Sequence, residues 1–158
     1  MAGVPNLSIS KIGPESDVVL RDLFQHYLRD MSEWFDVNAC DASAILQKGY
    51  DAYLAKVGDS PAGFALVGSA GEWADGVGAQ DVHEFFVLRE FRRSGVGHRM
   101  AALLWDERPG QWLVRVLEAN AAAVLFWRTV ISRHSHGAYE EEGRIVNGRP
   151  WRFLRFER

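Results

Sequence analysis

An apolar strand, a basic turn and a glycine-rich helix start follow one another within Phe85–His98. The first N–H groups of a helix have no partner inside the helix, and the helix dipole places partial positive charge on them. Gly95 and Gly97 lack Cβ atoms, so a bulky anion can approach this backbone closely. Arg92 and Arg93 add full positive charge and fork-shaped donors beside the same amides. The segment therefore predicts a phosphate or pyrophosphate site.

The bulk composition limits what else the chain could bind. Its 158 residues suggest one domain, 1–158, with a single substantial core. The formal net charge is −3 at pH 7, so the surface as a whole is not expected to attract nucleic acid. Any anion must instead be bound by a local patch, and the turn Arg92–His98 is the evident one.

The single cysteine, Cys40, excludes an internal disulfide and a cysteine-based zinc site, and it fits a reducing cytosol. The histidines show no metal-ligand spacing with carboxylates, so no metal is expected. The segment Met1–Asn6 lacks the pattern of a signal peptide, and no apolar run approaches the roughly 20 residues that a bilayer requires. We therefore expect a soluble, cytoplasmic protein that binds neither a membrane nor a metal.

Hydrophobic periodicity and turn residues predict the elements that must position the turn. The pattern from Ala70 to Gly78 predicts a loop, and the element order β-α-α-β-β-β-α-β-α-β-β indicates one α/β domain with a mixed sheet. Strands are predicted at Leu7–Ile12, Tyr50–Val57, Gly63–Val67, Val82–Leu88 and Trp112–Leu117, with two more around the turn Asn147-Gly148. Helices are predicted along the apolar stripe Leu20–Phe35, near Asp41–Lys48, from Val96 to Pro109-Gly110, and after the N-cap Asn120.

Other phosphate-binding turns fit this sequence less well. A P-loop requires Gly-Lys-Ser or Gly-Lys-Thr after its glycines, and neither follows here. The dinucleotide fingerprint requires a third glycine in a βαβ unit near the start of the chain. Here three predicted strands precede the strand that leads into this turn, and the third glycine is missing.

The segment Arg92-Arg93-Ser94-Gly95-Val96-Gly97 resembles the Arg/Gln-x-x-Gly-x-Gly/Ala signature of the GNAT superfamily of N-acetyltransferases. The apolar strand Glu84–Leu88 precedes it at the family's distance, and Asn120–Trp127 resembles the family's Asn-x-x-Ala-x-x-Phe-Tyr helix. The element order agrees over nearly the whole chain. The resemblance implies an α/β fold of the α+β type, whose mixed, mostly antiparallel sheet carries helices on both faces. It also implies an enzyme that transfers acetyl from acetyl-CoA to a primary amine by direct attack on the thioester.

The resemblance further implies where the co-substrate, acetyl-CoA, would bind. Its pyrophosphate would lie on the amides of Arg93–His98, with the side chains of Arg92 and Arg93 assisting. The pantetheine arm would bond to exposed amides and carbonyls of Phe86–Leu88. The implied contacts are Phe86, Val87, Leu88, Arg92, Arg93, Ser94, Gly95, Val96, Gly97 and His98, with Asn120 on the pantetheine arm and Phe126 lining its path.

The implied reaction needs a base, because an amine attacks a thioester only after its ammonium form has lost a proton. Glu84 is the first candidate because it lies beside the expected acetyl site, Asp81 is the next, and His83 is the third. Side chains alternate along a strand, so Asp81 and His83 share one face while Glu84 points to the other. In this family a free amide, here near Val87, can donate to the tetrahedral oxyanion.

The chain departs from the family pattern at Trp127, where members often carry a Tyr whose hydroxyl can protonate the departing thiolate. The indole N–H is a donor that does not titrate usefully, so Trp127 is expected to pack in the core or form a pocket wall. Either the thiolate leaves unaided, since a thiol with a pKa near about 8.5 is a fair leaving group, or another group such as Tyr139 acts.

The acceptor amine stays open, because pocket loops decide that choice. Polyamines, aminoglycosides, amino acids, and protein N-termini or lysines all fit, so the partner is a small-molecule or peptide amine. The first helices shape the acceptor pocket in this family, and Tyr27, Trp34 and Phe35 are therefore candidate substrate-binding residues, with core packing as the plainer interpretation. The run Glu140–Glu142 could attract a basic substrate, although acidic runs are usually solvated. Apolar residues on the late strands would suit a two-fold partner, so a homodimer is a hypothesis.

Two other functions compete with the enzyme. A non-catalytic module of the same fold could bind an acyl-CoA and regulate a partner, because the helix Tyr is missing. Release of free thiol with a panel of amines separates this alternative from the enzyme. A nucleic-acid-binding module is disfavoured by the acidic pI of about 5.9 and by the absence of interleaved surface aromatics. Tight, salt-sensitive binding of RNA or DNA would revive it.

Overall fold

The computed structural model describes residues 6–13, 17–36, 49–74 and 78–158. The described chain divides into two compact units, of which the first comprises Met1–Val67 and Glu84–Met100 and the second comprises Gly68–His83 and Ala101–Arg158. The predicted helix near Asp41–Lys48 lies outside the described residues, and the single-domain organisation stays a prediction. In the described ranges, no helix is both long and apolar enough to cross a bilayer.

Seven strands form a mixed sheet, as the sequence predicts, in the order β1-β2-β3-β4-β5-β7-β6. The pairs β1–β2, β2–β3, β5–β7 and β6–β7 are antiparallel, whereas β4 and β5 are parallel. A parallel pair needs a long crossover, which the helix between β4 and β5 provides. The strands are β1 Leu7–Ile12, β2 Asp51–Val57, β3 Ser60–Ser69, β4 Gln80–Val87, β5 Gln111–Leu117, β6 Tyr139–Val146 and β7 Arg149–Glu157.

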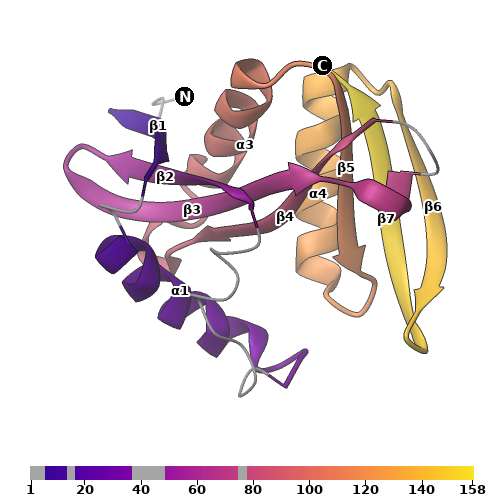
Figure 1. Ribbon diagram of the computed structural model, residues 1–158, viewed down its shortest axis with the longest axis horizontal. Helices are drawn as coiled ribbons and strands as arrows, with labels where there is room; N and C mark the ends of the chain where they lie inside the picture. The colour runs from indigo at the N-terminus through magenta and orange to yellow at the C-terminus, as the bar shows by residue number, and fades with distance from the viewer. Residues whose placement is uncertain (1–5, 14–16, 37–48, 75–77) are drawn as a thin grey trace. The chain divides into compact units, whose positions relative to one another are not determined.

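In the first unit, helix α1 (Asp17–Met31) packs its apolar stripe on the strands, and Figure 1 shows it beneath β2 and β3. Each large apolar side chain buried in this way contributes roughly 1.5–3 kcal/mol. The apolar stripe predicted a longer helix, but α1 ends at Met31, and Trp34 and Phe35 both donate their backbone N–H groups to the Met31 carbonyl. The buried core of this unit comprises Leu20, Leu23, Phe24, Ala52, Leu54, Phe64, Leu66 and Phe86.

The predicted hairpin of β2 and β3 is confirmed, although β3 is twice the predicted length. Gly58 in its turn has φ 61°, a left-handed conformation that glycine adopts without strain. Gly63 has a different role, because a Cβ built on it would lie 2.2 Å from the carbonyl oxygen of Phe86. Strand β4 can therefore approach β3 this closely only because residue 63 has no side chain.

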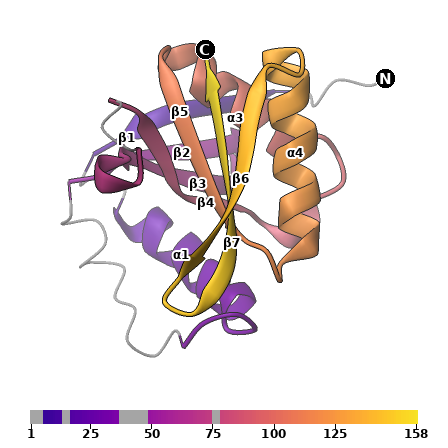
Figure 2. The same ribbon diagram turned by 90° about the vertical axis from the view of Figure 1, so that its right-hand side faces the viewer.

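In the second unit, helix α4 (Ala121–Ser135) lies alongside β5, β7 and β6, as Figure 2 shows. The predicted N-cap is confirmed, because the Asn120 side-chain oxygen accepts the Ala123 N–H at 3.2 Å. The predicted hairpin of β6 and β7 is also confirmed. Its turn residues Asn147 and Gly148 have φ 51° and 75°, the pair of positive values that a type I′ turn requires.

Aromatic packing fills the core of the second unit. Trp105 on α3 (Val96–Glu107) is fully buried, with its ring 6.3 Å from Trp127 and 4.6 Å from Phe156. The segment predicted as the loop Ala70–Gly78 contains the 3-10 helix η2 (Gly71–Ala74), so that prediction is wrong for these four residues. Ala70 and Ala74 are buried against Leu113 and Phe153, a contact that organises the segment.

Candidate functional site

The turn before α3 carries the residues that are predicted to bind an anion. A short 3-10 helix, η3 (Arg89–Phe91), leads into it, and Arg93 and Gly95 both take left-handed conformations, with φ 60° and 86°. The backbone bond from the Arg99 N–H to the Gly95 carbonyl, at 3.0 Å, opens the hydrogen-bond ladder of α3. The N–H groups of Val96 and Gly97 precede this bond, so helix geometry gives them no partner inside α3.

The two turn arginines have different environments. Arg92 donates through Nε to the Val87 carbonyl at 2.8 Å and through Nη2 to the Asp30 carboxylate at 2.5 Å. Its guanidinium carbon also lies 5.3 Å from the centre of the Phe86 ring. Arg93 is exposed, and no ion pair or hydrogen bond joins its guanidinium to any residue within the described ranges. Arg93 is therefore the turn arginine whose charge faces solvent and is available to an anion.

Strand β4 directs successive amides to opposite edges. The Leu88 N–H donates to the Ala62 carbonyl on β3 at 2.8 Å. Because backbone groups of neighbouring residues in a strand point to opposite edges, the Val87 N–H points away from β3. The Leu88 N–H is therefore already used and is not open to a pantetheine arm. Such an arm would have to share the Val87 carbonyl with Arg92.

The first candidate base, Glu84, has a fixed partner on α1. The hydroxyl of Tyr27 donates a hydrogen bond to Oε2 of Glu84, and both side chains are partly buried. The Tyr27 ring is held among Phe24, Phe64 and Phe86, with centroid distances of 5.4, 5.7 and 5.9 Å. Of the three predicted substrate-binding residues, Tyr27 thus lies at the edge of the core of the first unit beside Glu84. Trp34 and Phe35 follow the end of α1, and their predicted contacts with a substrate stay predictions.

The second candidate base, Asp81, belongs to a buried ion pair. It is 2% exposed, and its Oδ2 accepts a hydrogen bond from Arg115 Nη2 at 2.6 Å. His83 Nδ1 lies 3.7 Å from the same oxygen, which confirms that Asp81 and His83 share a face of β4. Arg115 in turn lies over the Trp73 ring, 5.0 Å from its centre. Asp81 is therefore already neutralised by the Arg115 guanidinium.

The pairing of β4 with β5 is short. It joins Gln80 to Trp112 and Asp81 to Leu113, at the start of β4. Both segments in this pairing belong to the second unit, whereas the β4 residues from Glu84 to Val87 belong to the first.

The remaining predicted site residues lie in the second unit. Asn120 caps α4 with its side chain, and the Phe126 ring stands edge-on to Trp127 at 4.9 Å. Their predicted contacts with a cofactor stay predictions. Trp127 is buried beside Trp105, so the expectation that it packs in the core is confirmed.

The acidic run Glu140–Glu142 is partly committed to ion pairs. The Glu141 carboxylate accepts hydrogen bonds from Nε and Nη2 of Arg128, each at 2.7 Å. It also accepts one from Nη2 of Arg152 at 2.8 Å. The Arg128 hydrogen bond is the main cause that lowers the pKa of Glu141, and Arg152 adds to it, while burial opposes both. Two of the acidic side chains thus hold β6 against its neighbours, since Glu142 also lies 3.3 Å from Arg155 on β7.

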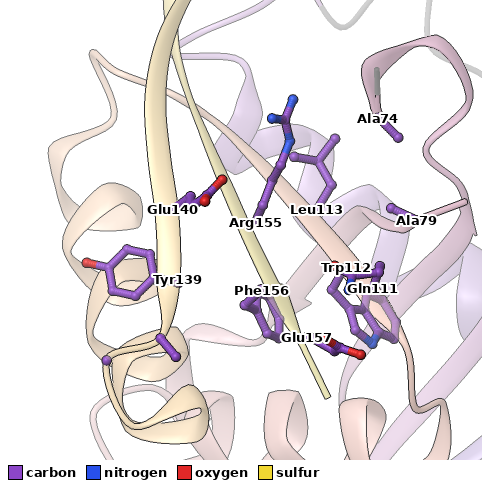
Figure 3. A pocket seen from close by; sticks show the side chains of 12 residues that line it. Ala74, Ala79, Gln111, Trp112, Leu113, Tyr139, Glu140, Arg155, Phe156 and Glu157 are labelled. Atoms are coloured by element: carbon purple, nitrogen blue, oxygen red, sulfur yellow. The ribbon is translucent and has the colours of Figure 1, made fainter. Parts of the chain in front are cut away.

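A cavity of about 540 Å³ opens in the second unit, at the start of β5 and β6, as Figure 3 shows. Tyr139 lines it, and Glu140 and Arg155 stand opposite each other across the β6–β7 ladder. Apart from Tyr139, which is the alternative proton donor, no predicted catalytic or cofactor-binding residue lines this cavity. No group of three or more His, Cys, Asp or Glu side chains within the described ranges is placed to hold a metal ion.

Comparison with known proteins identifies the fold. No protein-family model matches the chain, and no curated protein matches its sequence. Solved structures match over nearly the full length, at low sequence identity, and they are GNAT-family N-acetyltransferases. The ribosomal-protein-alanine N-acetyltransferase of Brucella melitensis has a TM-score of 0.70 at 15% identity and covers 96% of this chain and 99% of its own.

Two further structures extend this comparison. A GNAT-family acetyltransferase from Streptococcus agalactiae has a TM-score of 0.75 at 12% identity and covers 96% of this chain and 95% of its own. The protein yncA from Salmonella typhimurium, solved with its cofactor acetyl-CoA, has a TM-score of 0.66 at 13% identity. The match covers 96% of this chain and 94% of yncA. The predicted fold is therefore confirmed, while identities this low show the fold alone.

Proposed function

We propose that this chain, which has the GNAT acetyltransferase fold, transfers an acetyl group from acetyl-CoA to a primary amine. The observation that carries the proposal is the turn before α3. There the left-handed Gly95 leads into helix amides beside the exposed Arg93. A turn of this kind, in this position of this fold, suits the diphosphate of a coenzyme.

Free amides, glycines and an exposed guanidinium in the turn support a diphosphate as its ligand. The N–H groups of Val96 and Gly97 have no partner within α3, and the absence of a Cβ at residues 95 and 97 leaves room for phosphate oxygens. Arg93 supplies a guanidinium that binds no described residue. The pyrophosphate would then bind through these groups, with Arg92 contributing less because Asp30 and the Val87 carbonyl already occupy it.

The Val87 amide is the proposed donor to the acetyl oxygen. It points away from β3, and it lies three residues beyond Glu84 on the same strand. When bound, the coenzyme supplies an activated thioester whose carbonyl oxygen gains negative charge as the amine attacks. A fixed amide aimed at that oxygen stabilises the charge, and removal of such a donor typically costs about 10²–10³ in turnover.

Glu84 is the proposed base. Its carboxylate would take one proton from the substrate ammonium, so that the neutral nitrogen can attack the thioester carbon and form the new C–N bond. The tetrahedral adduct would then lose its second nitrogen proton to water and expel the thiolate as the C–S bond breaks. The hydrogen bond from Tyr27 fixes the direction of the carboxylate, and the Arg115 ion pair of Asp81 makes that second candidate less suitable. Trp127 is buried in the core, so the thiolate would leave without a proton from this helix position.

The experiment is a thiol-release assay with acetyl-CoA and a panel of amines. The panel contains a polyamine, an aminoglycoside, free amino acids, a lysine peptide, and a peptide with an N-terminal alanine. The last is included because one structural neighbour is named for that residue. We expect thiol release that depends on one class of amine, with a product heavier by one acetyl group in mass spectrometry. Tight binding of acetyl-CoA without thiol release from any amine would instead support the non-catalytic acyl-CoA module, which Trp127 at the Tyr position favours.

A further inference from the structure

We infer that Asp30 is a positioning residue of the acyl-transfer site, which holds Arg92 on the Val87 carbonyl and thereby fixes the strand segment that carries the Val87 N–H. This inference rests on the proposed function, because it assigns that amide a role in the reaction. All of the groups concerned belong to the first unit.

The chain of contacts begins on α1. The carboxylate of Asp30 is 25% exposed and binds Nη2 of Arg92 at 2.5 Å. Arg92 is itself 38% exposed, and its Nε donates to the Val87 carbonyl at 2.8 Å while its guanidinium rests over the Phe86 ring. A guanidinium is planar, so an anion that binds one of its edges also sets the direction of the Nε donor on the adjoining edge. Asp30 thus orients the donor that reaches Val87.

The two peptide groups around the Val87 α-carbon are each held from outside the strand. The peptide that joins Val87 to Leu88 is bound at both ends, with its carbonyl on Arg92 and its N–H on the Ala62 carbonyl. The preceding peptide, which carries the Val87 N–H, has its Phe86 carbonyl against Gly63, where any Cβ would lie 2.2 Å away. Together these contacts leave the Val87 N–H little freedom to turn.

This arrangement separates two roles that the sequence gives to one basic turn. Arg92 holds the backbone of β4 at Val87, and Arg93 would bind the diphosphate. If Asp30 loses its charge, the hold on Arg92 weakens, and the guanidinium becomes available to the phosphates instead. Loss of the Asp30 charge should therefore lower turnover without weakening coenzyme affinity, whereas simple damage to the fold would lower both.

The test compares Asp30→Asn with Arg89→Ala. Arg89 is the other cation beside Asp30, at 3.6 Å, and its side chain is 84% exposed, so this control removes a charge near Asp30 without touching the Arg92 contact. For Asp30→Asn we expect kcat to fall roughly tenfold, since small misplacement of a catalytic group is costly, with the Kd for CoA unchanged or lower. Arg89→Ala should leave kcat within about twofold. A double-mutant cycle with Arg92→Lys should be non-additive, because both changes break the same chain of contacts.

A readout that does not require activity tests the positioning of Val87 separately from the proposed function. The ¹H–¹⁵N resonance of the Val87 amide, measured without ligand, should move in Asp30→Asn and stay in place in Arg89→Ala. If the wild type acetylates no amine but the resonance moves as expected, the proposed function fails and the positioning of Val87 stands. An unmoved Val87 resonance in Asp30→Asn, or an unchanged kcat in an active enzyme, overturns the inference. A parallel loss of kcat, CoA affinity and thermal stability in Asp30→Asn would also overturn the inference.

Discussion

The hydroxyl of Tyr27 on α1 donates its hydrogen bond to the carboxylate of Glu84 on β4. The Tyr27 ring is held edge-on to Phe64 and Phe86, so the position of the hydroxyl is set by apolar packing. This contact joins a residue proposed to shape the acceptor site to the residue proposed as the base. It also shows how the core of the first unit can fix the geometry of a polar group at its edge.

Replacement Tyr27→Phe removes the hydroxyl and keeps the packed ring. We expect kcat to fall roughly tenfold, because the Glu84 carboxylate loses the donor that orients it, while the Kd for CoA stays within about twofold. The measurement is a steady-state assay with a titration of CoA into the same preparation. A loss of CoA affinity equal to the loss of kcat would show that Tyr27 supports the fold of the turn rather than the base.

Glu84→Gln removes the proposed base and leaves an amide oxygen that can still accept from Tyr27. General-base catalysis typically contributes about 10²–10⁴, so turnover should fall by roughly 10² at pH 7. The loss should be greatest at lower pH, where more of the substrate is ammonium and more depends on the base. The pH–rate profile of the variant is the measurement.

The matched control for this test is Asp81→Asn. It breaks the buried pair with Arg115, and such losses typically cost about 3–5 kcal/mol of stability. The shape of its pH–rate profile should nevertheless match that of the wild type. An unchanged profile in Glu84→Gln, with an altered one in Asp81→Asn, would assign the base to Asp81.

Acid should destabilise the protein partly through Glu141. Its pKa is lowered in the folded state, chiefly by the hydrogen bond from Arg128 and further by Arg152. The stability from this group is therefore complete above the ordinary pKa of a glutamate and is lost as the pH falls through the lowered folded value. Glu141→Gln should cost about 1 kcal/mol at neutral pH, and that cost should shrink toward zero in acid.

Chemical denaturation at a series of pH values measures this difference. Glu140→Gln is the control, because Glu140 is exposed and has no ion pair among the described residues. Its stability should follow the wild type at every pH. An equal acid dependence in the wild type and in Glu141→Gln would contradict the assignment.

His134 should make a second, separate contribution to acid sensitivity. Burial lowers its pKa, and the charge of Arg158 lowers it further. The folded state therefore favours the neutral ring, and stability should fall as the pH drops below the ordinary histidine value and toward the lowered one. The ring packs 4.9 Å from Trp105, so His134→Phe preserves the stacking partner and should flatten the change in melting temperature between pH 7.5 and pH 5.5. A slope as steep as that of the wild type would contradict the prediction.

The local features of the fold follow from short sequence signals. Asn120 predicts its own cap, and Asn147-Gly148 predicts the hairpin, because both depend on the conformations of neighbouring residues. The glycine turn before α3 is of the same kind. The end of α1 at Met31 was not predictable from periodicity, since the turn that follows α1 keeps Trp34 and Phe35 at helical spacing.

The polar contacts of the candidate site could not be predicted in the same way. Tyr27 and Glu84 are 57 positions apart, Asp30 and Arg92 are 62 apart, and Asp81 and Arg115 are 34 apart. No local spacing signals such pairs, because each depends on how separate elements pack. For the same reason the sequence motif predicts one shared role for Arg92 and Arg93, and only their different surroundings in the structure separate the two side chains.

The central claim is that the turn before α3 binds a diphosphate, and calorimetric titration with CoA tests it most directly. Gly97 is the residue to change, because Gly95 has φ 86° and any side chain there would strain the backbone. We expect the wild type to bind CoA with a Kd of about 1–100 μM, and pantetheine, which lacks the phosphates, far more weakly. Gly97→Val should weaken CoA binding at least roughly tenfold, and Gly97→Ala should weaken it by a smaller factor, because a Cβ at residue 97 narrows the approach of the phosphates and the larger side chain blocks it. A folded Gly97→Val protein that binds CoA as tightly as the wild type would contradict the account.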